Sequence, residues 1–166
     1  ATLPATSAQQ ILVGIETLDL RLRKISTDAT ALAGRLAAAG EVAEVHHPSL
    51  PGRPDRHLVA RDFPRGTSGV FSIDLHGGED AAAAFCDALE LWSLAVNLGD
   101  ARSLVCHPAS TTHSHLTPAQ REACGVSEGT VRLSVGLEDL EDLWADLSRG
   151  LEAARAVLPE TRAVTA

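Results

Sequence analysis

Aromatic and lysine side chains are nearly missing from this sequence. Tyrosine is absent, aromatic residues make up 3% of the 166 residues, and Lys24 is the single lysine. A self-sufficient cofactor enzyme usually draws on aromatic rings, or on a tuned lysine or tyrosine, in its site. Lys24 lies in the charged, helical segment RLRKIS. The composition therefore indicates one part of a larger assembly.

Other features that the sequence lacks exclude whole classes of protein. No run of 18 apolar residues is present, so no transmembrane helix is expected, and ATLPATSAQQ lacks the pattern of a signal peptide. The net charge is −8 and the thirteen arginines are scattered, which argues against nucleic-acid binding. Cys86, Cys106 and Cys124 are odd in number and lack CxxC spacing. A reduced, cytoplasmic compartment is the simplest interpretation.

The chain nevertheless has the length and apolar content of one folded domain. Its residues are 45% hydrophobic, which allows a proper core. Near the N-terminus, apolar residues recur at three- and four-residue steps, which predicts one long amphipathic helix that stops by Gly40. The stripe consists of Ile11, Leu12, Ile15, Leu18, Leu22, Ile25, Ala29, Leu32 and Leu36.

Short strand patterns and helical patterns alternate after Gly40. Strands are predicted at 42–46, 69–75, 94–96, 103–106 and 131–135. Helices are predicted over 79–91, from the Thr117 cap to Gly125, and from Leu140 onward, while 48–55 and the segment with Pro64 and Gly66 are loops. This order predicts a small α/β fold in which helices cover one sheet.

The segment HPASTTHSH, from His107 to His115, places three histidines within nine residues. Zinc needs three or four converging ligands, and a strand-like pair such as His113 and His115 is able to supply two of them. No Asp or Glu lies inside the segment to complete the set. The alternative, which we prefer, is that these histidines hydrogen-bond backbone groups in a tight loop.

The segment VRLSVGLED predicts a strand with an arginine on its outer face. Val131, Leu133 and Val135 alternate with Arg132 and Ser134, so Arg132 stands opposite the core side. The planar guanidinium matches a carboxylate in a bidentate way. The alternative is a strand arginine in a plain salt bridge, and spacing alone favours this alternative.

Longer motifs connect these two segments. The run GDARSLVCHPASTTHSHLTP, which follows Asn97 and Leu98, and the later RLSVGLED resemble the C-terminal part of the pyridoxal-phosphate enzymes of cysteine and methionine metabolism, the transsulfuration family. The early GIETLDLRL and the proline-rich loop after HHP are similar to the same family. The resemblance covers residues 1 to about 154.

The resemblance implies a fold and a domain organisation. It implies the small C-terminal domain of a fold-type I enzyme over residues 1–158, opening with a long helix, with a mostly antiparallel sheet of about four strands, and with a tail at 159–166. The large domain that binds the cofactor in this family is expected to be absent from the chain. Lys24 matches no cofactor lysine, so no catalytic or cofactor-binding residue is expected here, and the chain alone is expected to be inactive. The resemblance implies no metal-binding residue either.

The resemblance also implies a substrate site. Arg132 takes the place of the arginine that binds the α-carboxylate of the substrate. Asn97 and Leu98, with the backbone around them, take the place that helps to hold the same group. Thr111 takes the place of a residue at the side-chain end of the pocket, and the histidine loop is expected to line the site without a metal.

Within the family, Asn97 and the STTHS form are most similar to O-acetylhomoserine sulfhydrylase, which replaces acetate at Cγ by a sulfur nucleophile. Methionine or cystathionine γ-lyase, cystathionine γ-synthase and a non-catalytic interaction module are the alternatives. The expected cofactor of the whole enzyme is pyridoxal 5'-phosphate. The expected partners are an amino-acid substrate and the large domain, in the same chain or in a partner chain, within a homotetramer.

Overall fold

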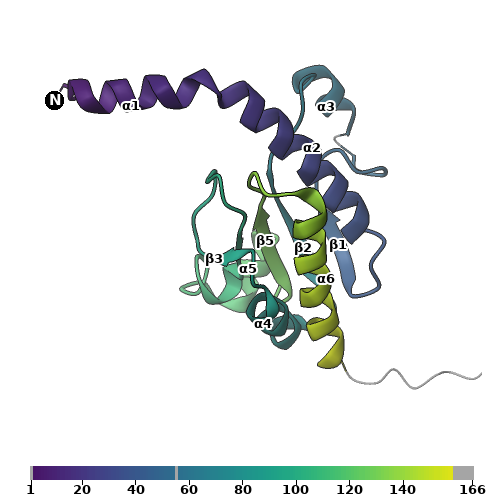
Figure 1. The fold of residues 1–166 in the computed structure, drawn as a ribbon. Helices are drawn as coiled ribbons and strands as arrows, with labels where there is room; N and C mark the ends of the chain where they lie inside the picture. Colours follow the sequence, from purple (N-terminus) through teal and green to yellow (C-terminus); the bar gives the residue numbers. More distant parts are fainter. Residues whose placement is uncertain (1, 55, 159–166) are drawn as a thin grey trace, which may run out of the picture.

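The computed structural model describes residues 2–54 and 56–158, which build one five-stranded sheet with helices around it (Figure 1). The strands follow the order β1-β2-β5-β4-β3, and every neighbouring pair is antiparallel except β3 and β4. Their bounds are β1 Val42–His46, β2 Val70–Leu75, β3 Ser93–Leu94, β4 Leu104–Cys106 and β5 Thr130–Ser134. The predicted α/β class and mostly antiparallel sheet are confirmed, with five strands instead of about four.

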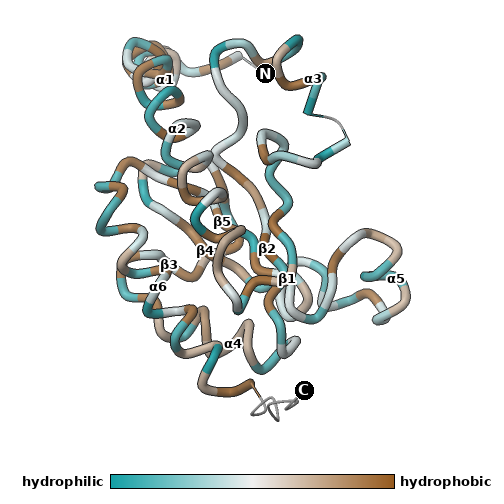
Figure 2. The backbone as a smooth tube through the Cα atoms, turned by 90° about the vertical axis from the view of Figure 1, so that its right-hand side faces the viewer, coloured by the Kyte–Doolittle hydropathy of each residue, from teal (hydrophilic) through white to brown (hydrophobic). Residues whose placement is uncertain are grey.

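Most of the helical mass lies on one face of this sheet. The helices are α1 Ala5–Glu16, α2 Leu18–Leu36, α3 Arg56–Asp62, α4 Gly78–Ala88, α5 Pro118–Ala123 and α6 Leu140–Ala156, with a short 3-10 turn η1 at Pro108–Ser110. In Figure 2, α4 and α6 lie on one side of the strands and α5 on the other. The core joins α2, α4 and α6 to the inward side chains of the strands, among them Phe71, Ile73, Val131, Leu133 and Val135. The opposite face of the sheet is left for polar side chains.

The predicted single N-terminal helix is in fact two helices. The chain breaks between α1 and α2 at Thr17, whose φ of −108° and ψ of 7° lie outside helical geometry. No residue of α1 is buried, whereas α2 buries Ala29, Leu32 and Leu36. The prediction of one continuous helix was therefore wrong, and its first half projects beyond the body of the fold (Figure 1).

Other local predictions differ from the structure mainly at element ends. The strand predicted at 42–46 and the last helix are confirmed, the strand predicted at 69–75 begins one residue later, and Thr117 forms a complete capping box with Gln120. Helix α4 ends at Ala88, three residues before the predicted end, and α3 was not predicted. In the described part of the chain, no helix is long and apolar enough to cross a membrane.

His47 is a fully buried imidazole that makes the stability of the fold depend on pH. Its Nδ1 accepts from the backbone N–H of Ser49 at 3.3 Å, and its ring meets Phe71 edge-on. Burial lowers the pKa of His47, although a backbone hydrogen bond with Ser68 acts in the opposite direction. The folded state therefore binds fewer protons than the unfolded chain below the unfolded pKa of about 6.5.

We expect the free energy of unfolding to fall as the pH drops from about 6.5 toward the lower pKa of the folded state. Replacing His47→Phe should make that decline shallower, because the buried titrating group is gone. Urea unfolding at a series of pH values between 7.5 and 5 measures the slope, and exposed His76→Gln serves as the matched control. Equal slopes in wild type and His47→Phe would contradict this explanation.

Candidate functional site

The open face of the sheet carries a row of polar side chains that runs across four strands. The register pairs His46 with Ser72, Ser72 with Arg132, and Arg132 with Cys106. Neighbouring strands are about 4.8 Å apart, so these side chains form one band on the face opposite the core. The predicted outward position of Arg132 is borne out, and the arginine stands near the middle of the band.

Arg132 is half-buried and holds the loop that follows β3. Its Nη2 donates to the backbone oxygens of Val96 at 2.9 Å and of Asn97 at 3.1 Å. The salt bridge that spacing alone favoured is not formed within the described residues, since no carboxylate pairs with Arg132 there. Nε and Nη1 donate to no atom of residues 2–54 and 56–158, so they remain for a ligand.

Asn97 and Leu98 form the exposed crest of the same loop. Leu98 exposes 53% of its surface. In the part of the chain that the structure describes, the backbone N–H groups of Asn97 and Leu98 have no protein acceptor, while the Asn97 carbonyl is held by Arg132. The guanidinium of Arg132 on β5 and the uncommitted N–H groups of the neighbouring loop are donors suited to an anion.

Thr111 ends the 3-10 turn η1, which follows Cys106 at the end of β4. Its hydroxyl donates to the carbonyl of His107 at 2.6 Å, at the exposed end of η1. Burial raises the pKa of the Cys106 thiol, while the charge of Arg132 and a hydrogen bond with Thr111 act against that rise. The thiol is therefore protonated at neutral pH and is not a nucleophile.

The three loop histidines have different surroundings. His107 is buried and uses both ring nitrogens, Nδ1 with the Ser110 hydroxyl at 2.8 Å and Nε2 with the Glu128 carbonyl at 2.9 Å. His113 and His115 lie at the surface, and Nδ1 of His113 contacts the Thr112 hydroxyl. The preferred interpretation as loop-bracing groups is confirmed for His107, and the expected lack of zinc at this loop stays a prediction.

The sequence argument missed a second cluster at the β1 edge of the band. Nε2 of His46 contacts Oδ2 of Asp74 at 2.7 Å, and Asp74 also accepts from Ser127 and Thr130. Glu44, His46 and Asp74 place one ligand atom each within 4.8 Å of one another. Alternation within 42–46 and 70–75 is a local pattern. It does not reveal that His46 and Asp74, which are 28 positions apart in the sequence, meet through the pairing of β1 with β2. Glu44 is already paired with Arg53.

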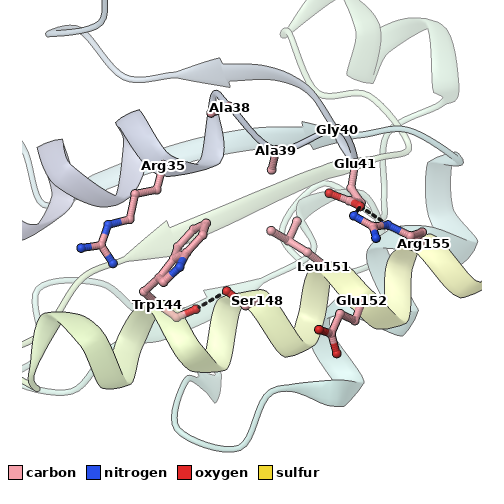
Figure 3. A pocket seen from close by; sticks show the side chains of 10 residues that line it. All are labelled: Arg35, Ala38, Ala39, Gly40, Glu41, Trp144, Ser148, Leu151, Glu152 and Arg155. Atoms are coloured by element: carbon pink, nitrogen blue, oxygen red, sulfur yellow. Dashed lines mark hydrogen bonds and ion pairs between the residues drawn. The ribbon is translucent and has the colours of Figure 1, made fainter.

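A large hollow of the described surface lies elsewhere. It is a groove of about 540 Å³ between the end of α2 and α6, and Figure 3 shows Arg35, Trp144 and Arg155 along it. Both arginines are already paired, Arg35 with Glu141 at 2.5 Å and Arg155 with Glu41. Because this groove lies on the helical layer and both of its arginines are paired, we place the candidate site at Arg132.

Comparison with known proteins decides which family this geometry belongs to. The family model described as "Cys/Met metabolism PLP-dependent enzyme" matches residues 1–152. The chain belongs to this family.

Relatives in this family catalyse different reactions. L-Methionine gamma-lyase of Pseudomonas putida is 44% identical over 154 residues, which are 93% of this chain and 38% of that protein. Cystathionine gamma synthase of Xanthomonas oryzae pv. oryzae, solved with cystathionine, superimposes with a TM-score of 0.82 at 44% identity, over 89% of this chain and 38% of that one. The chain thus spans about 38% of the length of these two relatives.

A third relative shows the cofactor of the family. A structure from Campylobacter jejuni, assigned as an O-acetylhomoserine (thiol)-lyase, contains N'-pyridoxyl-lysine-5'-monophosphate. It superimposes with a TM-score of 0.85 at 37% identity, over 92% of this chain and 36% of that one. The predicted resemblance, fold type and cofactor family are confirmed by these matches.

The residues of this chain do not fit the cofactor itself. Pyridoxal phosphate is held through a lysine, and Lys24 is the single lysine of the sequence. Its Nζ is paired with Asp28 at 2.5 Å on α2, away from the band around Arg132. Among the described residues, no aromatic side chain belongs to that band for stacking on a ring. We therefore derive no chemical step through the cofactor from this chain.

Proposed function

We propose that this chain supplies the site for the substrate α-carboxylate in a pyridoxal-phosphate enzyme of cysteine and methionine metabolism. The observation that carries the proposal is the hydrogen bonding of the Arg132 guanidinium. Only its Nη2 donates to described residues, so Nε and Nη1 are uncommitted, as are the N–H groups of Asn97 and Leu98. A carboxylate has the charge and the acceptors that such a site requires. Thr111 would border the side-chain end of the ligand.

Among the family's reactions we propose replacement of the acetyl group of O-acetylhomoserine by a sulfur nucleophile. Asn97 and Thr111 support this choice, because their motif forms are most similar to the sulfhydrylases. The lyase reaction is the second candidate, since methionine gamma-lyase of Pseudomonas putida shares 44% identity with this chain. The chain itself contributes orientation of the substrate, which is worth several kcal/mol when it fixes the reacting geometry.

We further propose that the chain acts as the C-terminal domain of such an enzyme. Its partner would be the large cofactor-binding domain of the family, in the same polypeptide or in another. The support is α1, on which Ile11, Leu12, Val13 and Ile15 are more than half exposed. Helices of about twelve residues are marginal in water, and Gly14 and the β-branched residues weaken this one further. A surface of this kind is stable when another domain covers it. Tetramer formation and a cytoplasmic location remain proposals.

The state of α1 in the chain alone tests the partner proposal. We expect its backbone amides to exchange with solvent at nearly unprotected rates, because no buried side chain anchors the helix, whereas the amides of α2 from Ala29 to Leu36 stay protected. Hydrogen-exchange NMR on the 166-residue protein measures both helices in one sample, and sedimentation equilibrium reports its mass. A protected α1 in a monomer would mean that no partner is needed.

The carboxylate site is tested without any cofactor. O-Acetyl-L-homoserine is titrated into the ¹⁵N-labelled chain while the Nε–H signal of Arg132 and the amide signals of Asn97 and Leu98 are followed. We expect saturable shifts at these groups in the millimolar range, and none with the methyl ester of the same compound, which lacks the carboxylate. Equal shifts with acid and ester, or no shift with either, would refute the carboxylate site.

A further inference from the structure

We propose that Ser134 and Gly136 are positioning residues that hold the loop 96–101 in the shape that the carboxylate site requires. This inference rests on the proposed function and extends it to residues that the motif comparison left without a role. Both follow Arg132 on the outer side of β5 and its extension, at steps of two. They therefore face the same loop that Arg132 contacts.

The loop is fastened to β5 and its extension at three successive points. Arg132 donates to the carbonyls of Val96 and Asn97. The hydroxyl of Ser134 accepts from the N–H of Gly99 at 3.3 Å, and the N–H of Leu137 donates to the carbonyl of Ala101 at 2.8 Å. The fastening continues past the loop, where the Ser103 hydroxyl accepts from Gly136 N–H and donates to Glu138.

Two glycines permit this close approach. Gly99 has a φ of +79°, which favours glycine, and it turns the loop back toward β5. A Cβ atom placed on Gly136 would lie 2.5 Å from the carbonyl oxygen of Ala101, so a side chain there would push the loop away. The loop backbone therefore lies as close to the strand as its atoms allow.

Ser134 is the side chain that holds the middle of the loop. It is 2% exposed, and its hydroxyl supplies the protein acceptor for Gly99 N–H, two positions after Asn97. Arg132 fixes the start of the loop but must also serve a ligand, so it cannot fix the donors of Asn97 and Leu98 alone. When the contact between Ser134 and Gly99 is present, those donors are ordered before the ligand arrives, which lowers the cost of binding.

The test compares Ser134→Ala with Ser134→Thr in the 166-residue chain. Alanine removes the acceptor, whereas threonine keeps a hydroxyl at a position that borders a groove of about 240 Å³ together with Gly99. We expect Ser134→Ala to speed the exchange of the Gly99 amide and to weaken the Kd for O-acetyl-L-homoserine about three- to tenfold, as for one lost hydrogen bond. Ser134→Thr should restore both values.

Ser148→Ala is the matched control, because that hydroxyl donates to the Trp144 carbonyl within α6 and is remote from the loop. If Ser134→Ala binds the ligand as tightly as wild type, the positioning role is wrong, whether or not Gly99 exchanges faster. If Ser134→Ala fails to fold, Gly136→Ala displaces the loop by another route, and an unchanged Kd there overturns the proposal. Failure of wild type to bind at all would instead refute the carboxylate site.

Discussion

Arg132→Lys is expected to lower kcat/KM about thirty- to a thousandfold, which corresponds to about 2–4 kcal/mol. The enzyme to be measured combines this chain with a large cofactor-binding domain of the family. The guanidinium has two tasks: Nη2 holds the carbonyls of Val96 and Asn97, and Nε and Nη1 remain for the substrate. A lysine keeps the charge but has one nitrogen for both tasks. Steady-state kinetics with O-acetylhomoserine measure the loss.

The same substitution should also abolish the shifts of Asn97 and Leu98 in the titration of the chain alone, a readout that does not depend on the cofactor. The matched control is Arg102→Lys, because Arg102 is exposed and its side chain has no hydrogen bond or ion pair among the described residues. Thermal unfolding should change little in either variant, since Arg132 leaves the core face. Near-normal kcat/KM in Arg132→Lys would mean that the arginine only braces the loop.

Asp146→Ala is expected to cost about 3–5 kcal/mol of folding free energy. The carboxylate is 3% exposed and accepts from the backbone N–H groups of Glu90, Leu91 and Trp92, while Arg149 pairs with it. Alanine would leave three N–H groups at the end of α4 without this acceptor. Tm should fall by roughly 6–20 °C, measured by scanning calorimetry.

The pKa of Asp146 gives this prediction an independent check. Burial raises the pKa, but the N–H groups of Glu90, Trp92 and Leu91, together with Arg149, outweigh burial and hold the pKa below its usual value. Its stabilisation is thus present above the unfolded pKa of about 3.9 and is lost as the pH falls through the folded pKa. Asp142→Ala, at an exposed position of the same helix, should cost at most about 1 kcal/mol. A similar loss in both variants would contradict the role of Asp146.

The sequence by itself determined the features that depend on neighbouring residues. Alternation over 131–135 placed Arg132 on the outer face of its strand, and the spacing of Thr117, Pro118 and Gln120 predicted a capping box that the structure contains. Such patterns are readable because side chains two or three positions apart interact within one element. The motifs around His107 and Arg132 likewise pointed to the family that the comparisons then showed.

The tertiary structure decided what depends on distant partners. Periodicity predicted one long helix where two exist, because a continuous apolar stripe reveals neither the break at Thr17 nor whether anything covers its first half. Strand register brought His46, Ser72, Arg132 and Cys106 into one row, and it brought Asp74 to His46. The contacts of Asp146 with 90–92, and of Arg132 and Ser134 with the loop 96–101, join residues 35 or more positions apart. Such contacts are formed by packing of the whole chain, so no local pattern encodes them.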